Sequence, residues 1–220
     1  MSKVGIGIIT CNRTDFLDTC IKSIKEDWYD ELVIINDGDI PVKKLGINII
    51  NNTENQGVCK SKNNAFKYLL DKNCDHIFLV EDDMKFTGNI FNEYIKASEV
   101  TGIEHFMFGY HGPANKGGVS GGKPTPRKII DYGETKIALN THCVGAVCYY
   151  TKKSLEDVGL FDEEFNKNNF EHVEHSYRLA KAGYSTPYWW WSDIANSLDY
   201  VQEQACSEDN SAIRRGDDWQ

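Results

Sequence analysis

The stretch HIFLVEDDM, residues 76–84, decides the fold, because a short apolar run ends there in three acids, Glu81, Asp82 and Asp83. A strand buried in a parallel sheet is apolar on both faces, and open α/β sheets bind ligands at the carboxyl ends of their strands. A hard cation such as Mg²⁺ or Mn²⁺ would offset the repulsion between the acids and leave room for a diphosphate. The stretch therefore predicts a strand leading into a metal site; the alternative is an acidic turn that begins a helix.

Apolar runs and helical patterns alternate along the first part of the chain. The runs Val4–Ile9, Leu32–Ile35 and Ile47–Ile50 each end in polar, turn-forming residues. Apolar residues recur at helical spacing after Thr14 and again after Gly57. This alternation predicts an α/β fold with a mostly parallel central sheet flanked by helices. The polar residues that follow the strands should then lie along one edge of the sheet.

Several of these polar residues suit a nucleotide. Asp37 would accept hydrogen bonds from the N–H groups of a base or from ribose hydroxyls. Lys60 and Lys62 stand at the start of the helix after Gly57, where lysine side chains and free helix amides would meet phosphate; the alternative is a solvated basic turn. Together with a metal at Asp83, these residues predict the binding of a nucleotide sugar.

Composition narrows the class of protein. A chain of 220 residues with 40% hydrophobic residues predicts one domain, and a net charge of −9 argues against a broad nucleic-acid surface. The first apolar run is too short for a signal peptide, and no later run approaches membrane-spanning length. Seven cysteines without a CxxC pair predict reduced thiols. We therefore expect a cytoplasmic protein without a transmembrane segment.

Six short motifs occur in the order and approximate spacing of the family 2 glycosyltransferases with the GT-A fold. They are TCNR (10–13), VIINDG (33–38), NQG (55–57) followed by Lys62-Asn63, LVEDD (79–83), VGLFDEEF (158–165) and FEHVEHSYRL (170–179). The chain resembles this family over nearly residues 1–188. The resemblance implies a GT-A domain over residues 1–193, with a donor half (about 1–109) and an acceptor half (about 129–193) that includes a small antiparallel element. We expect a C-terminal extension, 194–220, to pack on or near the active site.

The resemblance implies a metal-dependent glycosyltransferase that moves a sugar from a nucleoside diphosphate, with a UDP-sugar favoured, to an acceptor hydroxyl. Residues 81–83 match the family's DxD motif, so Asp83 would bind Mn²⁺ or Mg²⁺, with Glu81 as a further metal ligand. Glutamate at the first position of the motif departs from the family but keeps the charge. The residues expected to bind the donor are Thr10, Asn12, Arg13, Asn36, Asp37, Asn55, Gly57, Lys62, Glu81 and Asp82.

A second departure from the family lies at His172. The family commonly has an aspartate there, directly after a glutamate, as the base that deprotonates the acceptor hydroxyl. This chain offers Glu171, His172 and Glu174 as catalytic candidates, and a neutral imidazole has a suitable pKa with little tuning. His172 is therefore the first candidate for the base. In a second interpretation His172 binds the metal and Glu171 is the base; in a third, His172 only caps or packs a helix. A single displacement would invert the anomeric carbon.

The remaining expectations concern the acceptor side. The loop 111–128 is rich in glycine, proline and basic residues, which suits a lid or a patch for an anionic acceptor, and an ordinary insertion is the alternative. Residues 129–132 and 136–140 predict a hairpin. Sugars stack on aromatic rings, so at least one of three tryptophans should face the acceptor. They are Trp189, Trp190 and Trp191.

Two other functions remain compatible with the sequence. One is a non-catalytic nucleotide-sugar or glycan-binding module on the same fold; the other is a nucleotidyltransferase, although the glycine-rich phosphate-binding start expected of that class is missing after the first strand. The acceptor hydroxyl belongs to a glycan, a protein side chain or a hydroxylated base in nucleic acid, the last disfavoured by the acidity of the chain.

Overall fold

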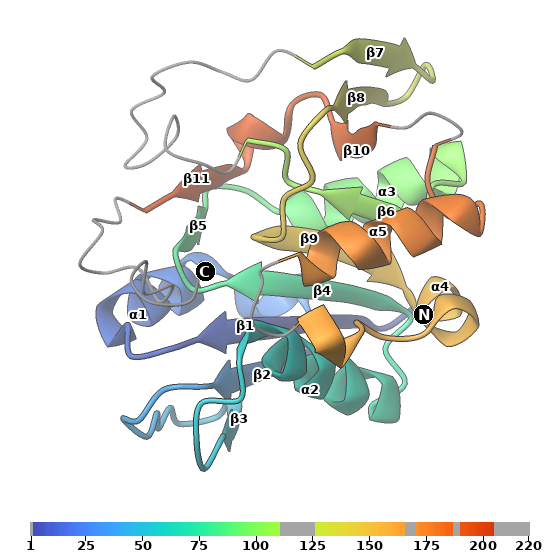
Figure 1. Ribbon diagram of the computed structural model, residues 1–220. Coiled ribbons are helices and arrows are strands. Elements are labelled where there is room, and N and C mark those ends of the chain that lie inside the picture. The colour runs from blue at the N-terminus through green and yellow to red at the C-terminus, as the bar shows by residue number, and fades with distance from the viewer. Residues whose placement is uncertain (1, 111–125, 166–169, 187–189, 205–220) are drawn as a thin grey trace.

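The computed structural model describes residues 2–110, 126–165, 170–186 and 190–204. Its centre is a six-stranded sheet with the strand order β3-β2-β1-β4-β9-β6 (Figure 1). The strands are β1 (Val4–Thr10), β2 (Glu31–Asn36), β3 (Asn48–Asn51), β4 (His76–Glu81), β6 (His105–Met107) and β9 (Val147–Thr151). β1 is parallel to β2 and β4, and β2 to β3, whereas β9 is antiparallel to β4 and β6. The predicted α/β fold with a mostly parallel sheet is confirmed.

Helices follow the strands as the alternating pattern predicts. They are α1 (Thr14–Ser23), α2 (Val58–Asp71), α3 (Ile90–Thr101), α4 (Lys152–Val158) and α5 (Glu171–Lys181), with short 3-10 turns η1 (Glu26–Trp28), η3 (Glu163–Phe165) and η4 (Ser197–Asp199). None of the helices among the described residues is both long and apolar enough to cross a membrane. The six cysteines in the described part of the chain are all free thiols, and Cys206 lies outside it.

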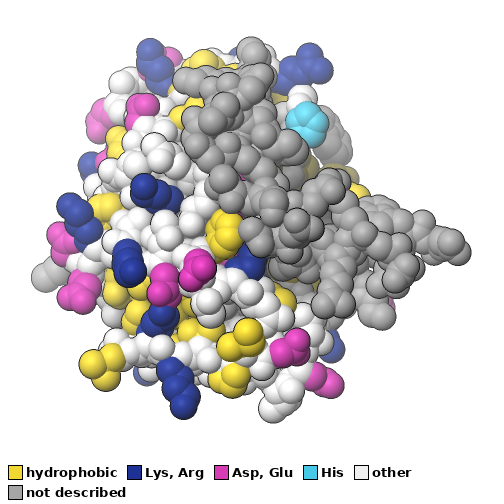
Figure 2. Space-filling view, turned by 90° about the vertical axis from the view of Figure 1, so that its left-hand side faces the viewer, with side chains coloured by type: hydrophobic (Ala, Val, Ile, Leu, Met, Phe, Trp, Pro, Cys, Tyr) yellow, Lys and Arg dark blue, Asp and Glu magenta, His cyan; other side chains and the backbone are white. Residues whose placement is uncertain are grey.

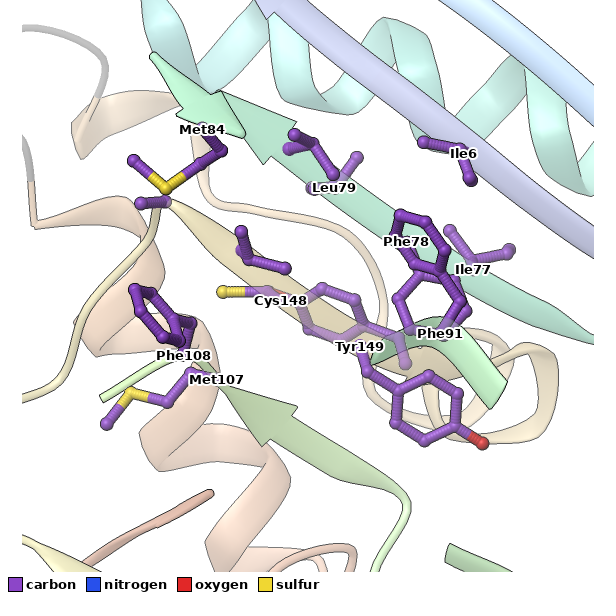
Figure 3. Packing of buried hydrophobic residues seen from close by; sticks show 14 of the residues in the cluster. Ile6, Ile77, Phe78, Leu79, Met84, Phe91, Met107, Phe108, Cys148 and Tyr149 are labelled. Carbon is purple, nitrogen blue, oxygen red and sulfur yellow. The ribbon is translucent and has the colours of Figure 1, made fainter. Parts of the chain in front are cut away.

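The core lies on both faces of β4, because neighbouring strand residues point to opposite sides of a sheet. Phe78 packs against Phe91 of α3, with ring centroids 4.9 Å apart, and against Tyr149 of β9 (Figure 3). Leu79 lies on the side of α2: a Cβ atom added to Gly7 of β1 would stand 3.3 Å from Leu79 and only 2.7 Å from the Cβ of Ala65 in α2. Helices therefore cover both faces of the sheet, and α2 lies close against β1.

Two smaller sheets complete the fold. The predicted hairpin is confirmed: β7 (Lys128–Asp131) and β8 (Lys136–Asn140) pair antiparallel, and β10 (Trp191–Ile194) joins β8 to make a three-stranded sheet. A second pair consists of β5 (Met84–Phe86) and β11 (Val201–Glu203). The described part of the C-terminal extension thus lies beside the strand that directly follows the acids. Most of the loop 111–128 and the tail 205–220 lie outside the described residues.

Candidate active site

The carboxyl ends of three neighbouring strands meet at one edge of the large sheet. Thr10 at the end of β1 is in register with Asn36 at the end of β2, and Ile9 is in register with Glu81 at the end of β4. The polar residues therefore line one edge, as the alternating pattern predicts. Figure 2 looks onto the molecule from this side, and in the part shown in colour basic and acidic side chains are interspersed.

The three acids form the end of a strand and a tight turn. Glu81 ends β4, Asp82 and Asp83 make the turn, and Met84 begins β5. The alternative of an acidic turn that begins a helix is therefore wrong, because the next helix, α3, starts only at Ile90. Asp82 and Asp83 are both buried. We call residues 81–83 the acid turn.

Arg13, at the start of α1, lies on the acid turn. Its guanidinium donates hydrogen bonds to both carboxylate oxygens of Asp82, and its Nη1 atom lies 3.3 Å from Oδ2 of Asp83. The Thr10 hydroxyl donates a further hydrogen bond of 2.6 Å to Asp82. Burial raises the pKa of Asp82, whereas Arg13 and Thr10 stabilise its ionised form. The repulsion between the two aspartates is thus offset within the protein itself.

The acid turn also has the chemistry of a metal site, because carboxylate oxygens are the ligands that Mg²⁺ and Mn²⁺ prefer. Within the described ranges, however, no group of three or more His, Cys, Asp or Glu side chains is placed to hold one metal ion, and His172 belongs to none. Magnesium in proteins is commonly held by one or two carboxylates, with phosphate and water as its other ligands. Asp82 and Asp83 therefore fit a metal that binds together with a diphosphate.

Lys62 of α2 connects the acid turn to α5. Its buried Nζ atom lies 3.0 Å from Glu81, 3.0 Å from Glu171 and 3.2 Å from the carbonyl oxygen of Gly145. Burial alone would lower the pKa of Lys62, but Glu171 and Glu81 outweigh it and raise that pKa. Lys62 therefore remains charged, and its three N–H groups have three protein acceptors.

His172 is held by the same cluster. Its Nδ1 atom lies 3.3 Å from Oε1 of Glu171, the oxygen that also accepts from Lys62. Burial alone would raise the pKa of Glu171, but Lys62 and His172 outweigh it and hold the pKa well below its usual range. In a neutral His172, an ionised Glu171 favours the tautomer that carries the proton on Nδ1, which makes Nε2 the acceptor nitrogen of the ring. Glu174, the third catalytic candidate, is instead paired with Arg178 one turn further along α5.

The predicted donor-binding residues after β2 hold the loops of this edge together. The buried carboxylate of Asp37 accepts from the Asn52 amide at 2.7 Å and from the backbone amides of Gln56 and Gly57 at 2.8 Å. It thereby fixes the start of α2, where Gly57 has a φ of 86°. Both carboxylate oxygens of Asp37 already have protein donors.

The three predicted asparagines also make contacts within these loops. The Asn36 amide donates to the carbonyl of Ile40 and to the side chain of Asn51. The side-chain oxygen of Asn12 accepts from the backbone of Asp39, and the Asn55 amide donates to the backbone oxygen of Asp37.

The predicted acceptor tryptophans are divided between described and undescribed parts of the chain. Trp190 and Trp191 are partly buried and pack against the hydrophobic core, whereas Trp189 lies outside the described residues. Trp191 begins β10, in register with Asn140 of β8.

Two residues make contacts in the site that the sequence did not predict. Gln204 follows β11, and its side-chain amide lies 3.0 Å from the carbonyl of Asp82 and 3.3 Å from that of Met84, while its backbone amide donates to Asp83. Gly145 approaches His172 so closely that an added Cβ would stand 3.0 Å from its ring. Both contacts depend on tertiary structure, so no local pattern could have revealed them.

Comparison with known proteins shows which family and which fold this chain resembles. Residues 6–110 match the family model described as glycosyl transferase family 2. A protein named uncharacterized glycosyltransferase R363, from Acanthamoeba polyphaga mimivirus, is 28% identical over 236 residues, which cover 96% of this chain and 85% of that protein.

Solved structures share the fold at low identity. TarS 1–349 from S. aureus, in complex with UDP-GlcNAc, superposes with a TM-score of 0.64 at 12% identity, over 94% of this chain and 60% of that one. The mannosyltransferase PcManGT from Pyrobaculum calidifontis, in complex with GDP-Man and Mn²⁺, gives a TM-score of 0.55 at 13% identity, over 83% of this chain and 53% of that one. The chain thus spans less than two thirds of these structures. Residues 6–110, just under half of the chain, are thus similar to glycosyl transferase family 2, and together with the relative from mimivirus and the strand order this match shows a glycosyltransferase with the GT-A fold.

Proposed function

We propose that this chain transfers a sugar from a nucleoside diphosphate donor, bound at the carboxyl edge of β1, β2 and β4, to an acceptor hydroxyl. The observation that carries the proposal is the position of Lys62, which lies 3.0 Å both from Glu81 of the acid turn and from Glu171 beside His172. A candidate phosphate and metal site and a candidate base are thereby linked through one side chain. The proposed single displacement uses both kinds of group, a cation at the leaving diphosphate and a base at the acceptor hydroxyl.

A UDP-sugar is the favoured donor. The fold neighbour TarS 1–349 is known in complex with UDP-GlcNAc and with UDP, although PcManGT is known with GDP-Man. In our proposal the acid turn and Arg13 face the diphosphate, and the loops held by Asp37 surround the nucleoside. Asn12 and Asn55 belong to the same loops.

A divalent metal completes the proposed donor site. Asp83, with Asp82, would hold Mn²⁺ or Mg²⁺, and the ion would neutralise negative charge that develops on the leaving diphosphate. PcManGT, a neighbour in fold, is known with Mn²⁺.

His172 acts as the base in this proposal, and Glu171 orients it. Nε2 of His172 accepts the proton of the acceptor hydroxyl, while that oxygen forms a bond to the anomeric carbon and the bond from this carbon to the diphosphate breaks. A single displacement of this kind inverts the anomeric centre. Glu171 suits the orienting role because its pKa is held well below the usual range, which makes it a weak base. The contact of 3.3 Å between Nδ1 of His172 and Oε1 of Glu171 suits a base that Glu171 orients, and we therefore propose His172 as the base rather than as a metal ligand.

The test measures release of nucleoside diphosphate from UDP-, GDP-, TDP- and CDP-sugars with Mn²⁺, Mg²⁺ or EDTA, with the anomeric configuration of the product determined by NMR. The variants are Asp83→Asn and His172→Ala. Glu156→Gln is a control, because Glu156 of α4 is exposed and lies near the start of β4, at the opposite edge of the sheet. We expect turnover of one donor, lost with EDTA and in both site variants and kept in Glu156→Gln. Metal-dependent donor binding without turnover against an acceptor panel would favour a binding module instead.

A further inference from the structure

Lys62 is a fully buried cation in the middle of the candidate active site, with a side chain only 2% exposed. Buried lysines are rare unless they are paired, and this one has three acceptors, on Glu81, Glu171 and the backbone of Gly145. An ammonium group has three N–H donors. Because each has a protein acceptor, Lys62 has no donor left for the phosphates of a nucleotide.

The acceptors of Lys62 come from segments that are far apart in the sequence. Glu81 ends β4, Gly145 precedes β9, and Glu171 begins α5, 109 residues after Lys62. Glu81 belongs to the donor half and Glu171 to the acceptor half of the domain. The single ammonium group therefore joins the end of β4, the segment before β9 and the start of α5 at the point where the transfer would take place.

Glu171 passes this constraint on to His172. Oε1 of Glu171 contacts both Nζ of Lys62 and Nδ1 of His172, and Oε2 is buried without a hydrogen-bond partner among the described residues. Gly145 closes the other side, because an added Cβ would stand 3.0 Å from the ring of His172 and 3.0 Å from Nζ of Lys62. The imidazole is thus confined by one carboxylate and one glycine.

We infer that Lys62 is a positioning residue for catalysis: it holds Glu171, and through it the ring of His172, in a fixed place relative to Glu81. This inference rests on the proposed function, in which His172 is the base. It replaces the expectation that Lys62 binds phosphate at the start of α2. The position of a catalytic group strongly affects the reaction rate, since a displacement of about 1 Å can lower the rate about 100-fold.

Three substitutions test the inference, and a fourth serves as control. Lys62→Met removes the charge, Lys62→Arg keeps the charge and changes its shape, and Gly145→Ala keeps the charge and moves His172. Lys67→Met is the control, because Lys67 is exposed on the same helix. Lys62→Met leaves two buried carboxylates without a cation and can fail to fold. In that case Lys62→Arg and Gly145→Ala still test the inference, because both keep the buried charge.

Kinetics separate positioning from phosphate binding. We expect kcat for sugar transfer to fall about 100-fold in Gly145→Ala and in Lys62→Met, and by less in Lys62→Arg. The Kd of UDP, measured by calorimetry in the presence of Mn²⁺, should stay within about threefold of the native value. A loss of UDP affinity in parallel with the loss of charge at Lys62 would overturn the inference, since that is the behaviour of a phosphate ligand.

A readout that needs no turnover distinguishes this inference from the proposed function. The ¹⁵N spectrum of the histidine rings, assigned with His172→Ala, reports which ring nitrogen of His172 carries the proton. We expect the Nδ1–H form in the native chain and in Lys67→Met, and a mixture of forms in Lys62→Met and Gly145→Ala. An unchanged His172 spectrum in both variants would overturn the positioning role, whether or not the native chain transfers any sugar.

Discussion

The guanidinium of Arg13 lies against the carboxylate of Asp82, and the same group reaches Asp83 at 3.3 Å. A cation of the protein thus occupies the place where the sequence predicts a divalent metal. Asp82 is completely buried and Arg13 largely so, and removing one partner of such a pair leaves an uncompensated charge. A metal that binds here has to share these carboxylates with Arg13 or displace it.

Arg13→Gln therefore tests competition between Arg13 and the metal. We expect the variant to lose about 3 kcal/mol of unfolding free energy without metal, because two buried carboxylates lose their cation. Mn²⁺ should then raise its Tm by more than it raises that of the native chain, measured by scanning calorimetry. Lys22→Gln on the exposed side of α1 is the control and should behave as the native chain does. Equal Mn²⁺ shifts in all three proteins would mean that Arg13 does not compete for the metal.

Asp37 anchors the loop that leads into α2, so its removal should destabilise this loop at the carboxyl edge of the sheet. Asp37→Ala leaves the Asn52 side chain and two backbone amides without their acceptor. Hydrogen bonds to charged groups contribute about 1.5–3 kcal/mol each, and we expect a total loss of about 3 kcal/mol because water reaches part of the loop. Urea unfolding measures this loss, and hydrogen exchange should show faster exchange at Gly57.

The control for this prediction is Asp39→Ala. Asp39 is an exposed acid of the same turn, and only its backbone amide makes a hydrogen bond to Asn12. We expect its unfolding free energy to stay within about 0.5 kcal/mol of the native value. If both variants lose the same stability, the carboxylate of Asp37 is not the anchor of the loop.

Local sequence patterns were sufficient to predict which residues lie at the carboxyl ends of the strands. They were not sufficient to predict the contacts between residues that are far apart in the sequence. The apolar run before Glu81 and the turn residues after β2 predict where strands end, because burial and backbone conformation are local properties. The partners of the acids are different: Lys62 is 109 residues from Glu171, and Gln204 is 122 residues from Asp82. The same carboxylates would suit a metal, a lysine or an arginine, so charge alone does not identify the partner.

Because of His175, we expect the unfolding free energy of the chain to depend on pH. Its ring is buried among Phe66, Tyr150 and Phe161, and its Nε2 donates to the carbonyl of Gly159. Burial lowers the pKa of His175 from 6.5 to about 3. Below pH 6.5 the unfolded chain therefore takes up a proton that the folded chain does not, and this site contributes less stability as the pH falls.

His175→Gln isolates this contribution from those of other groups. The variant is less stable than the native chain at pH 7, because the substitution disturbs the aromatic packing. Between pH 6.5 and pH 5 the native chain loses about 2 kcal/mol through His175, at about 1.4 kcal/mol per pH unit, and the variant does not. We therefore expect the difference in unfolding free energy to shrink by that amount at pH 5, as measured by urea unfolding. A constant difference would show that His175 is protonated equally in both states.

Gln204 fixes the backbone of the acid turn from the far end of the described chain. Its side-chain amide lies within 3.0–3.3 Å of the carbonyls of Asp82, Met84 and Phe16. Gln204→Ala should cost about 1–2 kcal/mol in unfolding free energy and weaken Mn²⁺-dependent binding of UDP, since the carboxylates of the turn lose a support. Gln202→Ala is the matched control, because Gln202 is exposed on β11; its stability should stay within about 0.5 kcal/mol of the native value, with unchanged UDP affinity. Urea unfolding and calorimetry measure both effects. If the two glutamine variants bind UDP equally well, the acid turn keeps its shape without the hydrogen bonds of the Gln204 side chain, and these bonds contribute to stability only.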